Sequence, residues 1–400
     1  MKTRRLKMSL NGTKEMLQHN VREFGMYIAL FVIIILFTIL TKGVFLSSRN
    51  ISNLLNQGGY IAVLAVGMTL VIIIRHIDLS VGYLSGFLGA VAAIAMVNWH
   101  LPVYIAIPLV LLFGAIAGLV PGFLVAKMSI PAFVATLAGW LGYRGALQLA
   151  TMAKGTIIIP NAAFNAISNG YLPDIPGISI LPGVHKLTLI LGFLVILLFI
   201  INSIIDRRKT QAYNFKVLSM ELFILKLVFV SALLGGITWV FAGYRGLSWT
   251  AVIILGVFLF YNFIMSRTFL GRHIYAVGGN PEAAELSGIS VKKITYVVFS
   301  SMGMLAALSG IMFASRLQSA TTTAGQLFEL DAIAAAFVGG ASASGGVGKV
   351  AGSIIGAFVM MSLTNGMNLM GIDISYQYIV RAIVLAGAVI YDVAVRKRKK

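Results

Sequence analysis

The sequence contains no cysteine, which excludes disulfide bonds, thiolate catalysis and zinc sites built on cysteine. Charge is scarce as well, because Asp, Glu, Lys and Arg make up only 11% of the 400 residues, against about 25% in soluble domains. With 12 acidic residues and 5 histidines, few groups remain for acid–base catalysis or metal binding. No paired-carboxylate motif, zinc-ligand spacing or nucleophile elbow is present. The sequence therefore predicts neither an enzyme nor a metal-binding protein.

A nucleotide site is missing too. Residues 345–349 resemble the end of a phosphate-binding loop, but Ala343 stands where that loop needs its first glycine, and Val350 where it needs Ser or Thr. Proton- and sodium-driven carriers generally need buried carboxylates or histidines, of which the apolar runs of this chain hold almost none. We therefore expect the energy for any transport to come from another protein.

Apolar sequence is abundant, since 59% of the residues are hydrophobic and the mean hydropathy is +0.94. Runs of about 17 to 25 apolar residues are long enough to cross a hydrocarbon core of about 30 Å. The predicted fold class is an all-α, polytopic transmembrane helical bundle of about 12 spans with discontinuous helices. The candidate spans are Phe24–Phe45, Gly58–Ile74, Val81–Val97, Leu101–Ala126, Pro131–Ala150, Leu187–Ile205, Glu221–Ala242, Trp249–Met265, Ile294–Ala314, Ala332–Gly346, Val350–Met367 and Tyr378–Val395.

The basic residues indicate how the bundle is oriented. If the runs alternate from an inside N-terminus, most of the 31 Lys and Arg fall on one side, and the positive-inside rule makes that side cytoplasmic. Both termini are then cytoplasmic, as basic tails at residues 1–23 and 396–400 that meet anionic lipid. This bias accounts for the net charge of +19 without a nucleic-acid partner.

Between the tails we predict one transmembrane domain, residues 24–395. Residues 151–186, rich in Pro, Gly and Asn, are expected to form an irregular extracytoplasmic loop. Glycines at four-residue spacing, such as Gly114 and Gly118, predict close helix packing.

Two polar stretches, residues 75–82 and 339–349, each interrupt a pair of apolar runs. Non-helical backbone at membrane depth is tolerated only where protein or a water-filled cavity satisfies it, and transporters often bind substrate beside such breaks. A substrate pathway between the two stretches is one interpretation. A pair of ordinary cytoplasmic turns is the other, and the sequence favours neither.

The loop at residues 266–293 is long for a membrane protein, which indicates that a partner docks there. Asn280 suits a helix N-cap, Pro281 the first helical position, Glu282 the positive helix end and Gly288 a left-handed stop. The loop is therefore predicted to hold a short cytoplasmic helix.

A pathway with little fixed charge suits a neutral, hydroxyl-bearing solute. The candidate pathway residues are Asp78 at the first break and, within the runs, Ser80, Tyr83, Ser85, Thr136, Trp140, Gln148, Asn365 and Asn368. Each has a structural alternative, because hydroxyls bond back to their own helix and aromatic rings pack between helices.

Several passages, taken together, resemble the permeases of ribose-, galactose- and xylose-type monosaccharide ABC importers. The extra segment 207–248 is similar to one in xylose and multiple-sugar members. The passages are Asn50-Ile51, residues 65–72, 77–82, 130–137 and 143–145, the loop 278–289, and residues 337–340 with Gly345-Gly346.

The resemblance implies a multi-pass permease of the bacterial inner membrane that imports a monosaccharide by alternating access. It implies a homodimer, two cytoplasmic ATPase subunits that bind the ATP, no cofactor on this chain, and an extracytoplasmic sugar-binding protein. An ion-driven carrier for a neutral solute and a permease for branched-chain amino acids are the alternatives. The residues implied to contact the ATPase are Gly279, Asn280, Pro281, Glu282, Ala283, Ala284, Glu285 and Gly288.

Overall fold

The computed structural model describes residues 21–152, 155–176, 182–213, 215 and 217–397, and most of these residues are helical. The predicted tails lie outside the described residues, except that residues 21–23 begin the first helix and residues 396–397 end the last one. The elements are α2 (Val21–Leu40), η1 (Val44–Leu46), α3 (Ser48–Ile73), α4 (Val81–Val97), α5 (Val103–Ala126), α6 (Ala132–Thr151), β1 (Thr156–Ile158), α7 (Ala162–Asn169), α8 (Lys186–Ala212), α9 (Met220–Ala242), α10 (Trp249–Arg267), α11 (Phe269–Gly279), α12 (Pro281–Leu286), α13 (Val291–Leu317), β2 (Ser319–Thr321), α14 (Phe328–Val338), α15 (Val350–Leu369) and α16 (Ile374–Lys397).

The predicted class, an all-α helical membrane protein, is confirmed. Among the described residues, 8 helices are long and apolar enough to cross a membrane: α3, α5, α8, α9, α10, α13, α15 and α16. Shorter apolar helices occur in α2 and α4. Each predicted run overlaps a helix, while the count of about 12 complete spans stays a prediction.

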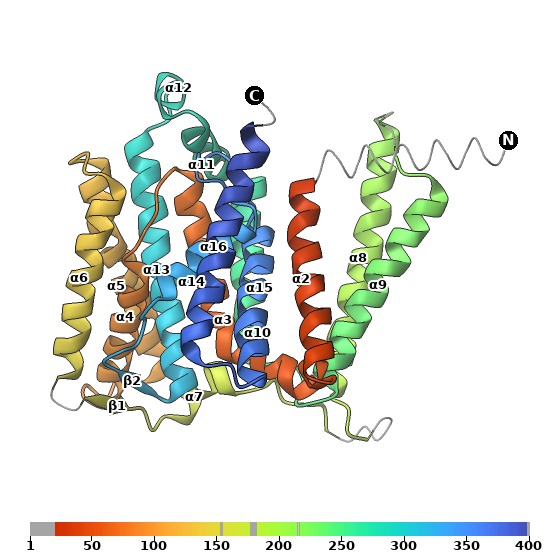
Figure 1. Ribbon diagram of the computed structural model, residues 1–400, viewed down its shortest axis with the longest axis horizontal. Helices are drawn as coiled ribbons and strands as arrows, with labels where there is room; N and C mark the ends of the chain where they lie inside the picture. Colours follow the sequence, from red (N-terminus) through yellow and green to blue (C-terminus); the bar gives the residue numbers. More distant parts are fainter. Residues whose placement is uncertain (1–20, 153–154, 177–181, 214, 216, 398–400) are drawn as a thin grey trace.

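The helices stand side by side and define two opposite faces (Figure 1). The α12 face carries α12 and both ends of the described chain, at Val21 and Lys397. The β1 face carries β1, β2 and α7. Both described ends thus lie on the side of the predicted docking loop, in agreement with the predicted topology. The assignment of the α12 face to the cytoplasm stays a prediction.

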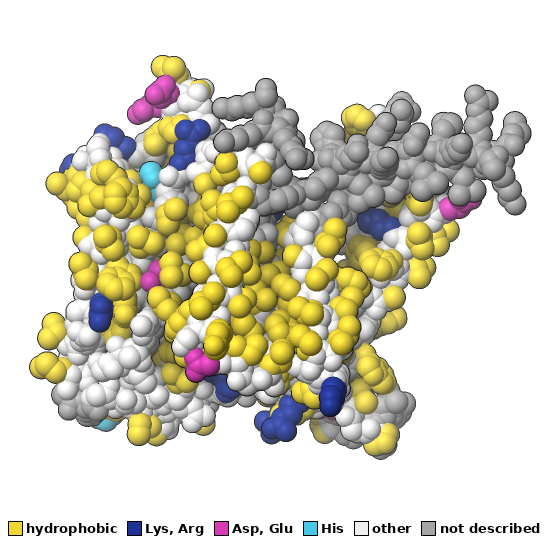
Figure 2. Space-filling model, in the orientation of Figure 1, with side chains coloured by type: hydrophobic (Ala, Val, Ile, Leu, Met, Phe, Trp, Pro, Cys, Tyr) yellow, Lys and Arg dark blue, Asp and Glu magenta, His cyan; other side chains and the backbone are white. Residues whose placement is uncertain are grey.

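Hydrophobic side chains cover much of the side of the bundle between these faces, and most visible charged side chains lie near one face or the other (Figure 2). This distribution suits a protein whose side faces lipid.

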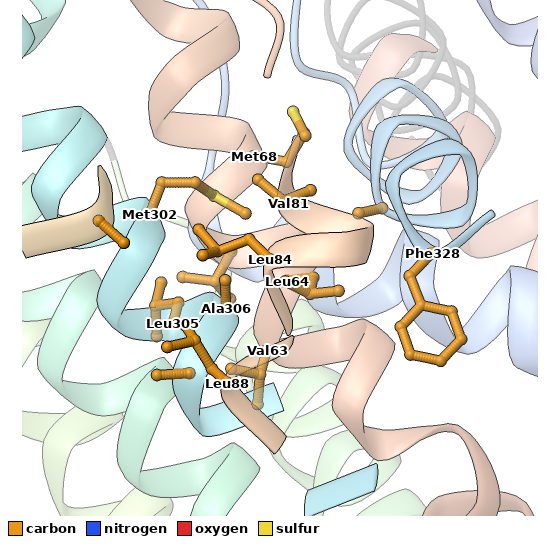
Figure 3. Close-up of a cluster of buried hydrophobic side chains, with 14 of the residues drawn as sticks. Val63, Leu64, Met68, Val81, Leu84, Leu88, Met302, Leu305, Ala306 and Phe328 are labelled. Atoms are coloured by element: carbon orange, nitrogen blue, oxygen red, sulfur yellow. The ribbon is translucent and has the colours of Figure 1, made fainter. Parts of the chain in front are cut away.

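The core lies where α3, α4 and α13 pack against one another (Figure 3). Small residues allow the close approach, as predicted: a Cβ on Gly303 of α13 would overlap the carbonyl oxygen of Gly114 in α5. The labelled core side chains are Val63, Leu64, Met68, Val81, Leu84, Leu88, Met302, Leu305, Ala306 and Phe328.

Two helices begin inside the bundle rather than at a face. Residues 74–80 run back into the protein after α3, and α4 starts beside Gly139, about two turns into α6. From the opposite face, residues 322–327 run inward after β2, and α14 starts at Phe328. The two N-terminal ends meet so closely that a Cβ on Gly82 would overlap the carbonyl oxygen of Gly325. The first predicted break is therefore a re-entrant segment.

The predicted span Ala332–Gly346 is wrong. α14 ends at Val338, and residues 339–349 form a turn at the α12 face, which is the alternative left open for the second break. Glycines cause the stop, because Gly340, Gly345 and Gly346 adopt positive φ values of 87°, 77° and 70°. The inward segment that pairs with residues 74–80 comes before α14, not after it.

The expectation of an irregular segment at residues 151–186 is also partly wrong. β1 pairs antiparallel with β2, with Thr156 opposite Thr321. The side chain of Asn161 caps α7, and Phe164 is fully buried. Regular structure therefore forms at the β1 face through strand pairing, helix capping and burial. The amino-acid composition of the segment does not reveal these contacts.

Candidate functional site

The loop at residues 266–293 contains the predicted short helix, α12. The Asn280 side chain accepts a hydrogen bond from the Ala283 N–H at 3.1 Å, Pro281 is the first helical residue, and Gly288 adopts a φ of 82° after the helix. The local prediction is therefore confirmed. The sequence did not reveal α11, whose N-cap is Thr268.

α12 presents a mixed acidic and apolar surface. The side chains of Glu282, Ala283 and Glu285 are exposed, and Leu286 is 91% exposed at the end of the helix. Acidic and hydrophobic side chains gather on the projecting tip of the α12 face (Figure 2). An exposed leucine in this setting is a candidate anchor for a partner protein. Ala284, predicted to contact the partner, is 4% exposed and belongs to the buried hydrophobic cluster of the bundle.

A junction beneath α12 joins α11 to the two loops that turn at this face. The Nε of Arg75 donates to the carbonyl oxygen of Gly278 at 2.7 Å, and its Nη2 donates to that of Gly279. The Gly346 N–H donates to the carbonyl oxygen of Ile73 at 2.8 Å. Residues at the end of α3, the end of α11 and the 339–349 turn are therefore held together.

Tyr275 adds a further link in this junction. Its hydroxyl donates to the carbonyl oxygen of Gly348 at 2.7 Å, and burial raises its pKa, so the donor proton is retained. Gly278 leaves no space for a side chain, since a Cβ there would overlap the carbonyl oxygen of Ile73. α11 therefore contacts both loops directly.

Five of the predicted pathway residues, Asp78, Ser80, Tyr83, Thr136 and Trp140, gather near the start of α4. Asp78 is 2% exposed and accepts hydrogen bonds from Ser80, at 2.9 Å from the backbone N–H and 2.6 Å from the hydroxyl. Tyr83 packs edge-on against Trp140 with ring centroids 4.9 Å apart. The Thr136 hydroxyl donates to Ala132 of its own helix at 2.8 Å, as the structural alternative predicted.

The sequence reasoning missed Glu329, which completes this interior cluster. Its Oε1 accepts the indole N–H of Trp140 at 3.0 Å, which ties the start of α14 to α6. Arg144 stacks over Trp140, 5.6 Å from the ring centroid. These contacts hold α6 against the meeting point of α4 and α14.

Two other predicted residues, Asn365 and Asn368, line a cavity of about 250 Å³ instead. Asn365 exchanges amide hydrogen bonds with Asn50, at 2.8 and 3.1 Å, and so clamps α15 to α3. Asn368 accepts a hydrogen bond from Gln377 at 2.7 Å. Of the last two predicted residues, Ser85 is buried in α4 and Gln148 is exposed on α6, so the structure does not bring all the predicted pathway residues together.

The same cavity is lined by an ion pair that the sequence reasoning did not identify. Arg381 Nη1 lies 3.1 Å from Asp331 Oδ2, and both side chains are mostly buried. Arg381 inside the predicted run Tyr378–Val395 was the available signal, with Asp331 directly before the run Ala332–Gly346, because charged residues are rare at membrane depth and usually have a partner. In the described part of the chain, no group of three or more His, Asp or Glu could hold a metal ion.

Comparisons with known proteins agree with this architecture. Residues 50–389 match a family described as the permease component of branched-chain amino acid transport systems. The chain is 38% identical over 380 residues to the xylose transport system permease of Haemophilus influenzae, covering 95% of this chain and 98% of that protein. The chain belongs to this permease family.

Two further relatives extend the comparison. The xylose transport system permease of Escherichia coli K12 is 40% identical over 382 residues, covering 95% of this chain and 93% of that protein. The ribose import permease of Haemophilus influenzae is 36% identical over 369 residues, covering 92% of this chain and 91% of that protein. No solved structure matches the permease. The resemblance to sugar permeases seen in the sequence is confirmed.

Proposed function

We propose that this protein is the membrane-spanning subunit of an ATP-driven importer in the bacterial inner membrane, and that it carries a monosaccharide inward by alternating access. Xylose is the first candidate, because relatives named for xylose transport match almost the whole chain. ATP is bound and hydrolysed by two copies of a cytoplasmic ATPase. An extracytoplasmic sugar-binding protein delivers the substrate, and two permease copies form the pathway.

The observation that carries this proposal is the junction beneath α12. α12 projects from the bundle with Leu286 and two acidic side chains exposed, and Arg75 connects the adjoining end of α11 to the start of re-entrant segment 74–80. Movement of a docked ATPase would therefore displace the residues that precede α4. The face that carries α12, with both termini, is cytoplasmic in this proposal.

A branched-chain amino acid is the rival substrate, because the family description names that class. The cavity beside Asn368 suits a sugar, since Gln57, Gln326 and Thr364 supply neutral hydrogen-bonding groups there, and its two charged residues, Asp331 and Arg381, pair with each other.

The test is ATP hydrolysis by the complete complex in proteoliposomes, measured with the binding protein and either xylose or leucine. We expect stimulation by xylose. Glu282→Arg and Gly288→Pro should abolish the stimulation while basal hydrolysis and membrane insertion remain, because the first reverses an exposed charge on α12 and the second cannot adopt the φ of 82°.

The matched control is Glu221→Arg, which reverses a charge in the first turn of α9, away from α12. It should keep the stimulation of the unmodified complex. Stimulation by leucine alone would favour the amino-acid rival, and unchanged stimulation in both α12 variants would contradict the role given to α12.

A further inference from the structure

The cavity beside Asn368 lies near the β1 face. Its walls include Leu54 and Gln57 from the first turns of α3, the last turn of α15, and Ile374 at the start of α16. These helix ends all lie at that face (Figure 1). In the proposed orientation the cavity therefore receives solutes from outside the cell.

Its chemistry suits a sugar ring. Asn368, Gln57 and Thr364 supply amide and hydroxyl groups that can donate and accept hydrogen bonds. Tyr60 and Phe328 pack with ring centroids 4.6 Å apart and form an aromatic wall. At about 250 Å³ the space lies just below the range of roughly 300–1,000 Å³ usual for ligand pockets, which favours a small solute.

The ion pair between Asp331 and Arg381 lies at the end of this cavity that is farther from the β1 face. Both residues also line a second cavity of about 180 Å³, which extends toward the α12 face along Ala334 and Leu385. The Nε of Arg381 is buried without a hydrogen-bond partner among the described residues. A buried donor without a partner is costly, so a ligand hydroxyl that accepted from it would be favoured.

We propose that the first cavity is a transit site for a monosaccharide, and that the Asp331–Arg381 pair separates it from the second cavity and contacts the sugar hydroxyls. This inference rests on the proposed function and adds the residues that meet the substrate inside the permease. The carboxylate accepts hydrogen bonds from vicinal hydroxyls and the guanidinium donates to them. While the Asp331–Arg381 ion pair is formed, the sugar stays in the first cavity until the helices rearrange.

The absence of native cysteine makes a direct test possible, because any introduced cysteine is the only one. Thr364→Cys places a thiol in the cavity, and Ser375→Cys places one on the exposed part of α16 outside it. Each variant complex is treated with a small membrane-impermeant thiol reagent, with and without saturating xylose and the binding protein. Xylose should slow labelling at Thr364→Cys at least roughly fivefold and leave Ser375→Cys unchanged.

A second measurement tests the separation of the two cavities. Ala334→Cys lies in the second cavity and should be labelled from the outer side only when combined with Arg381→Gln. Arg381→Gln should also lower sugar import at least roughly tenfold. Asp373→Asn, which changes an exposed acid at the same face, should leave import unchanged.

The outcomes separate the two proposals. A complex that imports xylose but labels Thr364→Cys equally with and without the sugar overturns the transit site alone. Outer labelling of Ala334→Cys with Arg381 intact overturns the separating role of the pair. A complex that imports no sugar at all overturns the proposed function, and the transit site with it.

Discussion

Arg75 fastens the end of α11 to the start of the first re-entrant segment, through the 2.7 Å hydrogen bond from its Nε to the carbonyl oxygen of Gly278. Arg75 itself adopts a left-handed φ of 66°, uncommon for a residue other than glycine. In the proposed function, this link would carry a movement of α12 to the re-entrant segment.

Replacing this arginine should uncouple the permease. We expect Arg75→Gln to reduce xylose-stimulated ATP hydrolysis about tenfold, because hydrogen bonds to charged groups contribute about 1.5–3 kcal/mol and 1.4 kcal/mol is a factor of ten. Arg272→Gln removes the same charge from the exposed side of α11 and is the control. Wild-type stimulation in Arg75→Gln would show that the link carries no movement.

Two adjacent glycines give a matched test of the same junction. Gly278→Ala should destabilise the permease by roughly 1–3 kcal/mol, since the new methyl overlaps the carbonyl oxygen of Ile73 and overpacking costs this much. Gly279→Ala meets nothing within 4 Å and should be tolerated. Thermal unfolding in detergent measures both, and equal unfolding temperatures would be inconsistent with the close contact.

The exposed leucine of α12 should anchor the ATPase. Full burial of a leucine side chain is worth about 1.5–3 kcal/mol, so Leu286→Ala should weaken ATPase binding at least tenfold. Leu149→Ala, at a side chain 70% exposed near the end of α6, is the control. The readout is the dissociation constant of the detergent-solubilised permease with its ATPase. An unchanged constant for Leu286→Ala would remove this anchor.

Asp174 should make the β1 face sensitive to acid. Partial burial opposes its ionisation, but the N–H groups of Leu187 and Ile175, with His185 and Lys186 beside it, outweigh that effect and lower the pKa to about 2. A pKa below the unfolded value of about 3.9 means that the carboxylate stabilises the fold above that pH, and that this stabilisation is lost as the pH falls through 2.

Asp174→Asn should therefore lower the unfolding temperature at pH 7 but not near pH 2. Asp206→Asn, at an exposed position toward the other end of α8, is the comparison. If Asp174→Asn lowered the unfolding temperature by the same amount at pH 7 and at pH 2, the assigned pKa of Asp174 would be contradicted.

Local structure was predictable from the sequence because its causes are short-range. Asn280, Pro281 and Gly288 specify α12 within nine residues, and hydropathy located every long helix to within a few turns. The glycine- and serine-rich turn that follows α14 carries no charged residue before Lys349, so the apolar run had no clear end at Val338. The error in Ala332–Gly346 has this origin.

The site itself depends on contacts between distant segments. The pairing of Arg75 with Gly278 spans 203 residues, and that of Arg381 with Asp331 spans 50. The residues next to Arg75 and Arg381 in the sequence do not indicate which distant residue each arginine contacts. The aromatic and hydroxyl residues near Trp140 were identified by residue type. Residue type could not show that they pack at the meeting point of α4 and α14, or that Asn368 lines a separate cavity.

The most direct test of the account is the uptake of radiolabelled xylose into proteoliposomes. We expect uptake when the permease is reconstituted with its ATPase, the binding protein and ATP, and none when any of these is omitted, whatever proton or sodium gradient is applied. Gradient-driven uptake by liposomes that contain this chain alone would contradict the proposal that the permease depends on a separate ATPase.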